Sequence, residues 1–328
     1  SSSGEGIIDV DAATVFANSV GGTTAIASLD LDHTSTFNGD LKATGAMDVA
    51  VSKVATVKGD MTIGGELTVI GDLDFAGTAA ITVNAFMQDG GTTGEVANIN
   101  TSTGGVTFVQ ALGTQVDGTA DLLDIFSAAT ATKSILQADD NMADEINLVG
   151  SATIVLDRTI LADQTVFMDS AETVAADIPT TAKIFLPSNL KDGEAIYFLS
   201  DVTTVSTIAA NITTASQDNA FYTYAATVVR EVDTGNVDDV KITASARSAT
   251  DIATTLSTSI NDATALYEAS RAAADGVAND TTLVDLMSNM LNSQNGRTPA
   301  DAATLAKQVA PQTDTIGGSS VATRAMTG

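Results

Sequence analysis

The 328-residue chain contains no cysteine, no tryptophan and a single histidine, His33. The absence of cysteine excludes disulfide bonds, thiolate metal sites and cysteine nucleophiles. One histidine cannot build a metal site from several imidazoles, and most histidine-dependent catalysis is excluded with it. Nothing around His33 resembles the Gly-x-Ser-x-Gly motif of serine hydrolases. These absences argue against an enzyme.

Basic residues are also scarce, because 14 Lys and Arg stand against 41 Asp and Glu, a net charge of −27. A surface this acidic repels nucleic acids and anionic lipids, so we expect no nucleic-acid partner. No apolar run approaches the ~18 residues that span a bilayer, so we expect no membrane insertion of this chain. The chain opens with small residues rather than a basic and apolar leader, which favours the mature form of a secreted protein.

Aromatic residues make up only 4% of a chain that is 44% hydrophobic. This composition predicts a core built from Val, Ile, Leu, Ala and Met. Thr and Val favour strands, whereas Gly and Asp favour the turns between them. We therefore expect a mainly β protein.

A six-residue repeat runs through the N-terminal part in the order glycine, polar, apolar, polar, apolar, variable. Its third and fifth positions point to the same side of a strand. We interpret the glycine as a corner residue, because glycine accepts positive φ at little cost. Short strands joined by corners predict a β-solenoid, with a β-meander or a stack of hairpins as the alternative. The repeats begin at Gly39, Gly45, Gly59, Gly65 and Gly71, with a weaker copy at Gly77.

The pattern divides the chain into three regions. Residues 1–180 are predicted to form a β-solenoid-like region, and residues 181–246 a β-rich domain or its continuation. Residues 247–328 are predicted to form a short α-helical region with a tail of small residues. Ile252, Leu256, Ile260, Ala263 and Tyr267 predict one amphipathic helix, capped by Ser248 or Thr250. Two more helices are predicted at 283–291 and, from the Thr298-Pro299 start to Pro311, at 298–311.

Paired acids are common, and residues two apart on a strand can offer two carboxylates to Ca²⁺. No stretch has EF-hand spacing, and the simpler interpretation is a set of solvent-facing acids at turns. Glycosidase-type acid pairs are the less favoured alternative, because few aromatic residues are present to bind sugar. The candidate calcium ligands are Asp30, Asp32, Asp72, Asp74, Asp139, Asp140, Asp144 and Glu145.

Two resemblances bear on function. The stretch 279–328 contains Leu283-Val284-Asp285-Leu286-Met287 and then Arg297-Thr298-Pro299-Ala300-Asp301, and it resembles the junction that precedes the membrane barrel in autotransporters. That resemblance implies secretion by a Gram-negative bacterium, and the acidic composition suits a saline habitat. The hexads resemble those of β-solenoid polymers such as bactofilins, and those of phage tail fibres. Both are structural assemblies, and neither resemblance implies a catalytic residue.

The function predicted from these observations is that of an extracellular structural protein that assembles with copies of itself into a filament, sheath or surface layer. The alternative is a cell-surface adhesin of the autotransporter passenger type, with glycan or lipopolysaccharide as a contact. A polysaccharide-cleaving enzyme on a β-helix is a third hypothesis, and it requires an acid or metal cluster along a groove. Calcium is the one cofactor that the acid pairs suggest.

Overall fold

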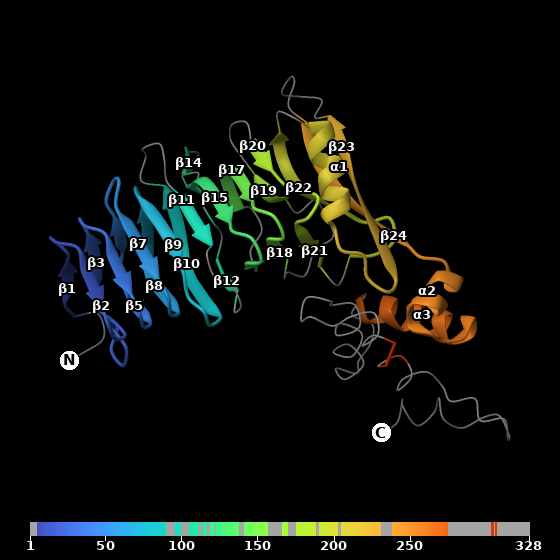
Figure 1. The fold of residues 1–328 in the computed structure, drawn as a ribbon, viewed down its shortest axis with the longest axis horizontal. Coiled ribbons are helices and arrows are strands. Elements are labelled where there is room, and N and C mark those ends of the chain that lie inside the picture. Colours follow the sequence, from blue (N-terminus) through green and yellow to red (C-terminus); the bar gives the residue numbers. More distant parts are fainter. Residues whose placement is uncertain are drawn as a thin grey trace. The chain divides into compact units, whose positions relative to one another are not determined.

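The computed structural model describes residues 5–89, 96–99, 105–110, 112, 114–116, 119–121, 123–137, 141–156, 166–169, 175–187, 190–202, 205–230, 238–274, 303–304 and 306. The chain groups into two compact units. Unit 1 comprises Ser1–Pro187, Ala195–Gln217 and Tyr224–Thr243, and unit 2 comprises Ser188–Glu194, Asp218–Thr223 and Ala244–Gly328. The protein is mainly β, and its parallel sheets form a β-solenoid of about 6 turns (Figure 1). The predicted fold class is thereby confirmed.

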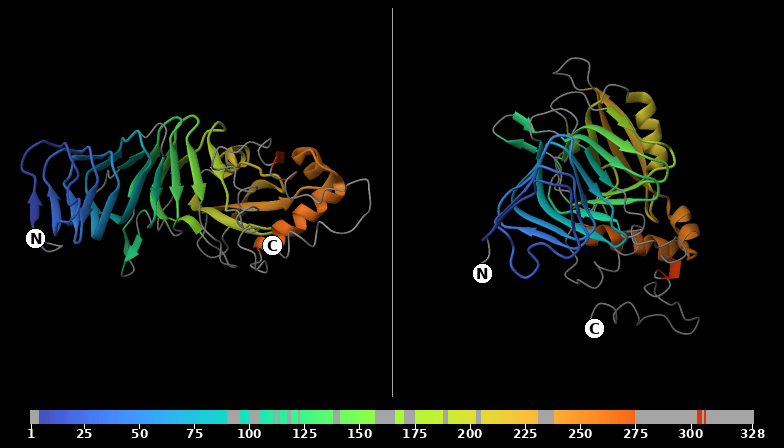
Figure 2. Two further views of the ribbon diagram at one scale, coloured as in Figure 1. Left: turned by 90° about the horizontal axis from the view of Figure 1, so that it is seen from below. Right: turned by 60° about the vertical axis from the view of Figure 1, so that its left-hand side comes forward.

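Two long sheets build the solenoid, and successive strands alternate between them so that each turn of the chain adds a strand to both. Figure 2 (left) shows the N-terminal coils, in blue to green, standing next to one another. The first sheet contains β1 (Ile7–Asp9), β3 (Ser28–Leu31), β5 (Leu41–Ala43), β6 (Met47–Val49), β8 (Met61–Val69), β10 (Ile81–Asp89), β12 (Val106–Phe108), β16 (Lys133–Leu136), β18 (Thr153–Leu156) and β21 (Lys183–Phe185).

The second sheet starts at the same end of the chain and carries the two longest late strands. Its members are β2 (Thr14–Phe16), β4 (Ser35–Phe37), β7 (Val54–Val57), β9 (Asp72–Phe75), β11 (Val96–Ile99), β15 (Leu123–Ala128), β17 (Asn141–Leu148), β19 (Val166–Asp169), β20 (Ala175–Asp177), β22 (Ala195–Val202), β23 (Tyr222–Arg230) and β24 (Asp238–Ala246). A separate antiparallel hairpin joins β13 (Thr114–Val116) to β14 (Thr119–Asp121). The coil-to-coil pairs are parallel, which rules out the hairpin stack.

The hexads are the sides of the coils. The three hexads that begin at Gly59, Gly65 and Gly71 supply residues 61–63, 67–69 and 72–75, which pair with β5, β6 and β7 of the preceding turn. The third and fifth positions point inward as predicted: Met61, Ile63, Leu67, Val69, Leu73 and Phe75 are all at most 2% exposed. Each hexad therefore buries two side chains, and stacking of the coils makes these pairs one continuous core.

The aspartate at the second hexad position links one coil to the next. The N–H of Asp60 donates to Oδ1 of Asp40 at 3.2 Å, 20 residues earlier, and the N–H of Thr82 donates to Oδ1 of Asp60 at 2.7 Å, 22 residues earlier. Ser19 begins the same ladder, since its Oγ accepts from the N–H of Asp40 at 3.1 Å. These side chains bind main-chain N–H groups at or just before the first residues of β5, β8 and β10.

The hexad glycines have a different role from the one expected. None of them is among the residues with positive φ. An ideal Cβ on Gly59 would instead lie 2.6 Å from the carbonyl carbon of Gly39, and one on Gly65 would lie 2.7 Å from that of Gly45. The prediction of positive φ was wrong, because it considered one corner alone. The glycines are needed because the backbones of adjacent coils approach too closely for a Cβ.

Aromatic residues contribute more to the core than their number suggested. Phe37, Phe75, Phe108, Phe126 and Phe221 are among the largest fully buried side chains. Phe108 makes edge-to-face contacts with both Phe75 (centroids 5.4 Å apart) and Phe126 (6.3 Å). The prediction of a purely aliphatic core was wrong, because Phe37, Phe75, Phe108 and Phe126 occupy fully buried positions in successive coils.

The last strands of unit 1 depart from the parallel coil. Strand β24 pairs antiparallel with β22, and β23 follows β24 at the end of the sheet. Helix α1 (Val205–Ala215) lies alongside β23 (Figure 1) and buries Ile208, Ala209, Ile212 and Ala215. Just after α1, Ser216 forms a parallel bridge with Ile184 of β21, and the N–H of Gln217 donates to the carbonyl of Ile184.

Residues 249–274 of unit 2 form two helices where the apolar spacing predicted one. Helix α2 (Ala249–Leu256) ends at Ser257, which has a φ of 52°, and helix α3 (Ile260–Ala274) starts three residues later. The four-residue spacing of Leu256 and Ile260 fits one helix face equally well, so the break could not be read from it. Each helix begins with Ser-x-x-Asp, and the serine Oγ accepts the N–H of Asp251 or Asp262 at 3.1 Å. Ser248 is therefore the cap, as predicted.

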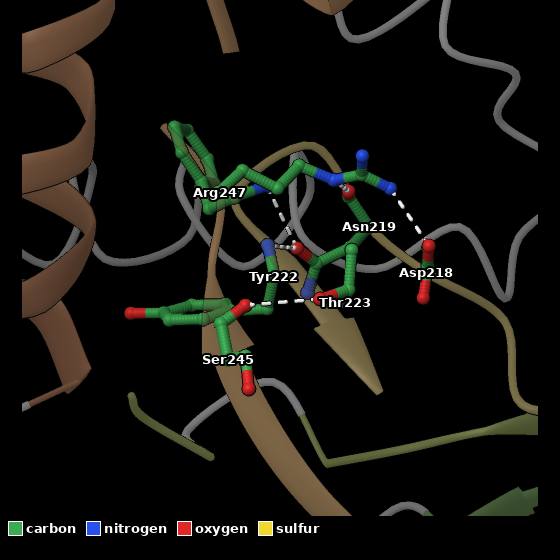
Figure 3. A network of polar contacts seen from close by, with 7 residues as sticks. Asp218, Asn219, Tyr222, Thr223, Ser245 and Arg247 are labelled. Carbon is green, nitrogen blue, oxygen red and sulfur yellow. Dashed lines mark hydrogen bonds and ion pairs between the residues drawn. The ribbon is translucent and has the colours of Figure 1, made fainter. Parts of the chain in front are cut away.

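The loop before β23 is held to the end of β24 within unit 2 (Figure 3). Arg247 forms an ion pair with Asp218 at 2.9 Å, and its Nε donates to the carbonyl of Asn219 at 3.0 Å. The side chain of Asn219 accepts hydrogen bonds from the N–H groups of Phe221 and Tyr222, both at 2.8 Å.

In the described part of the chain, no helix is long and apolar enough to cross a bilayer. The helices predicted at 283–291 and 298–311 lie outside the described residues, except for helical Ala303, Thr304 and Ala306.

Candidate functional site

The first coil of the solenoid is a candidate functional site because one side of it is uncovered. Strands β1 and β2 stand at the ends of the two sheets, and no described strand pairs with their outer edges. The N–H of Thr14 donates to the carbonyl of Thr34, and the carbonyl of Phe16 accepts from the N–H of Asn38. Both groups therefore face the strand β4. Backbone groups alternate in direction along a strand, so the N–H and C=O of Val15 point away from the solenoid.

The interior of this first coil is also only partly covered. Phe16 stacks on Phe37 of the next coil, with ring centroids 4.8 Å apart and ring planes inclined by 3°. Phe37 is 1% exposed, whereas Phe16 and Ile8, the inward residues of the terminal strands, remain half-buried. The outward Ile7 and Val15 are 73% and 65% exposed. An aromatic ring face and two open strand edges are thus presented together.

An acidic cluster lies on the same coils. Carboxylate oxygens of Asp9, Asp11 and Asp32 all lie within 4.8 Å of one another, and the three side chains are exposed. The register explains how the fold assembles them, since β1 pairs with β3 and brings Asp9 beside Asp30. Strand β6 extends the column, because Asp48 pairs with Asp30 on the other side. Acids separated by some twenty residues in sequence therefore become neighbours.

Partial burial and electrostatic repulsion in this cluster both perturb the pKa of Asp30. Partial burial raises the pKa of Asp30, and the neighbouring carboxylates of Asp32, Asp48, Asp9 and Asp11 raise it further. The pKa of Asp72 is raised in the same way, first by burial and then by Asp74. A bound cation would relieve this repulsion, and Ca²⁺ prefers six to eight oxygen ligands of this kind. Asp9, Asp11 and Asp32 can supply three of them.

The predicted calcium ligands do not come together as one set. Asp30 and Asp32 lie in the cluster, whereas Asp72 and Asp74 share β9 on the other sheet. Glu145 is a half-buried residue of β17, and Asp144 belongs to the same strand. Asp139 and Asp140 lie outside the described residues. Asp9 and Asp11 are not among the predicted ligands, because only the register of the coils places them beside Asp32.

The hydroxyl of Ser35 bonds to the main chain of His33. Oγ of Ser35 donates to the main-chain carbonyl of His33 at 3.0 Å, so this contact leaves the imidazole out. His33 itself is exposed. Comparison of the chain with protein-family models, with curated proteins and with solved structures finds no match.

Proposed function

We propose that this chain is an extracellular structural protein, without catalytic activity, that assembles with copies of itself through the first coil of its solenoid. The supporting observation is the pair of open strand edges at β1 and β2. An exposed edge of main-chain donors and acceptors is a template for pairing with another strand. Parallel coils provide two such edges at one end, so an added strand pair would continue both sheets.

The half-buried residues support the same end. Docking of another strand layer would cover the free face of Phe16 and the side chain of Ile8. In the next coil, Phe37 and Leu29 are already covered in this way by their neighbours. Burial of apolar surface contributes roughly 25 cal/mol per Å². The aspartates at this end oppose the approach of another acidic surface, and Ca²⁺ held by Asp9, Asp11 and Asp32 would lower that barrier.

The test is electron microscopy of the purified chain with Ca²⁺ and after addition of EDTA. We expect regular assemblies with Ca²⁺ and their loss in EDTA. Discrete particles under both conditions would contradict self-assembly and favour the surface adhesin. Assemblies that persist in EDTA would retain the structural function but remove the role of the cation.

A pair of variants tests whether the first coil is the contact. Val15→Pro removes an N–H that faces the open edge and breaks no bond inside the solenoid, since proline is tolerated on edge strands. Val15→Ala shortens the same side chain but keeps the N–H. We expect Val15→Pro to abolish the assemblies and Val15→Ala to retain them. Equal assembly by both variants would exclude strand addition at β2.

A further inference from the structure

The far end of the same sheet is closed by a specific contact. Strand β23 is the last strand of the second sheet, and Asn219 already holds the N–H and the carbonyl of Tyr222 at its start. Thr213 of helix α1 lies against it: the N–H of Ala226 donates to Oγ1 of Thr213 at 2.9 Å, and that hydroxyl donates to the carbonyl of Ala226 at 3.3 Å. One side chain thus occupies both backbone groups of one edge residue.

The contact with Thr213 involves backbone groups on the outer edge of β23. The N–H and C=O of Ala226 point to the side of α1, so they are the groups that a further strand would use. Backbone groups alternate in direction, and those of Val228 therefore point to the same side. Covering an edge with a helix is a known means of preventing strand addition. Figure 1 shows α1 next to β23.

We propose that α1 is a built-in stop, in which the Thr213 hydroxyl blocks pairing of β23 with the same strand of a second copy. The two ends of the sheet then differ: the β2 edge is open and the β23 edge is closed. Strand addition between copies is thereby confined to the edges of the first coil. The stop at β23 does not depend on assembly at the first coil, since it concerns a different edge.

The experiment replaces the hydroxyl without changing the shape of the side chain. Thr213→Val removes the contact, and Thr214→Val makes the same change on the exposed side of the helix, where the hydroxyl bonds only to Ala210 within α1. At low protein concentration we expect the amide of Ala226 to exchange hydrogen on the order of tenfold faster in Thr213→Val, because it loses its acceptor. Thr214→Val should match the unmodified chain.

At high concentration we expect Thr213→Val to associate, with new protection from hydrogen exchange in β23. Adding Val228→Lys should reverse this association, because a lysine on an edge strand discourages pairing. Protection confined to β1 and β2 would report assembly at the first coil instead, so the two contacts are distinguishable. Equal exchange of Ala226 and equal association in Thr213→Val and Thr214→Val would overturn the proposal. If Thr213→Val does not fold, Thr213→Ala removes the same hydroxyl with a smaller side chain, and Thr213→Ser should behave like the unmodified chain.

Discussion

Replacing Gly65 with alanine would place a Cβ between two coils that have no room for it. That atom would lie 2.7 Å from the carbonyl carbon, 3.0 Å from the carbonyl oxygen of Gly45, and 2.8 Å from the nitrogen of Ala46. Carbon atoms in contact prefer about 3.5–4.0 Å. All three neighbours are backbone atoms, so no side chain can rotate away. The coils must separate, which also strains the hydrogen bond from the N–H of Gly65 to the carbonyl of Gly45 at 3.2 Å.

The size of the effect follows from two destabilising contributions and one stabilising contribution. Overpacking of this kind costs about 1–3 kcal/mol. Weakening one hydrogen bond adds about 1 kcal/mol. The alanine restricts the unfolded chain and returns about 0.4–1 kcal/mol. We therefore expect Gly65→Ala to lower the free energy of unfolding by roughly 1–4 kcal/mol.

Urea denaturation followed by circular dichroism measures this change, and Gly22→Ala is the matched control. A Cβ on Gly22 would meet only the Cβ of Ser19 at 3.6 Å, an ordinary contact, and Gly22 does not have positive φ. We expect the control to change stability by less than about 0.5 kcal/mol. Equal stability of the two variants would refute the conclusion that close approach of the coils requires the hexad glycine.

Three further changes test other contacts. Ser134 has a fully buried hydroxyl without a hydrogen-bond partner, so we expect Ser134→Ala to raise the free energy of unfolding by about 1 kcal/mol in urea denaturation; a loss of stability would contradict this. The pKa of Asp30 is raised in the folded protein, so protonation of Asp30 stabilises the fold. This stabilisation is complete below the ordinary pKa of 3.8, and it is lost as the pH rises through the raised pKa of the folded state. We therefore expect Asp30→Asn to increase the melting temperature at pH 7, with the gain shrinking as the pH falls toward 4, and a gain independent of pH would exclude the repulsion. Ser248→Ala should destabilise α2 by about 1 kcal/mol, measured as faster hydrogen exchange of the Asp251 amide, and unchanged exchange would exclude the cap.

The limits of sequence reasoning are clearest in the acidic cluster and in the helices. Asp9 and Asp11 belong to a pattern that occurs many times along the chain, and a local pattern cannot tell which pairs meet. Their position beside Asp32 depends on the length of the first turn, which sets the register of β1 on β3. Likewise, the apolar spacing around Leu256 and Ile260 fits one helix, and the backbone reversal at Ser257 carries no strong signal.

The contact between Thr213 and β23 is another feature that the sequence pattern does not predict. Thr213 is one of many threonines, and its helix has no distinctive motif. Its hydroxyl acquires a role only because the chain returns and lays Ala226 against it, 13 residues later. Such a contact joins a helix to a strand edge and has no period that a sequence could display.

The sequence alone determined the solenoid, because alternation within each hexad decides which side chains point inward, and this information is local. It also indicated the cap at Ser248, as one of two candidates, because a cap depends on residues three apart. Tertiary structure decided why the hexad residue is glycine, which aspartates meet, and which sheet edge is closed. These features depend on distances between neighbouring coils, and those distances are set by turn lengths and register rather than by any one repeat.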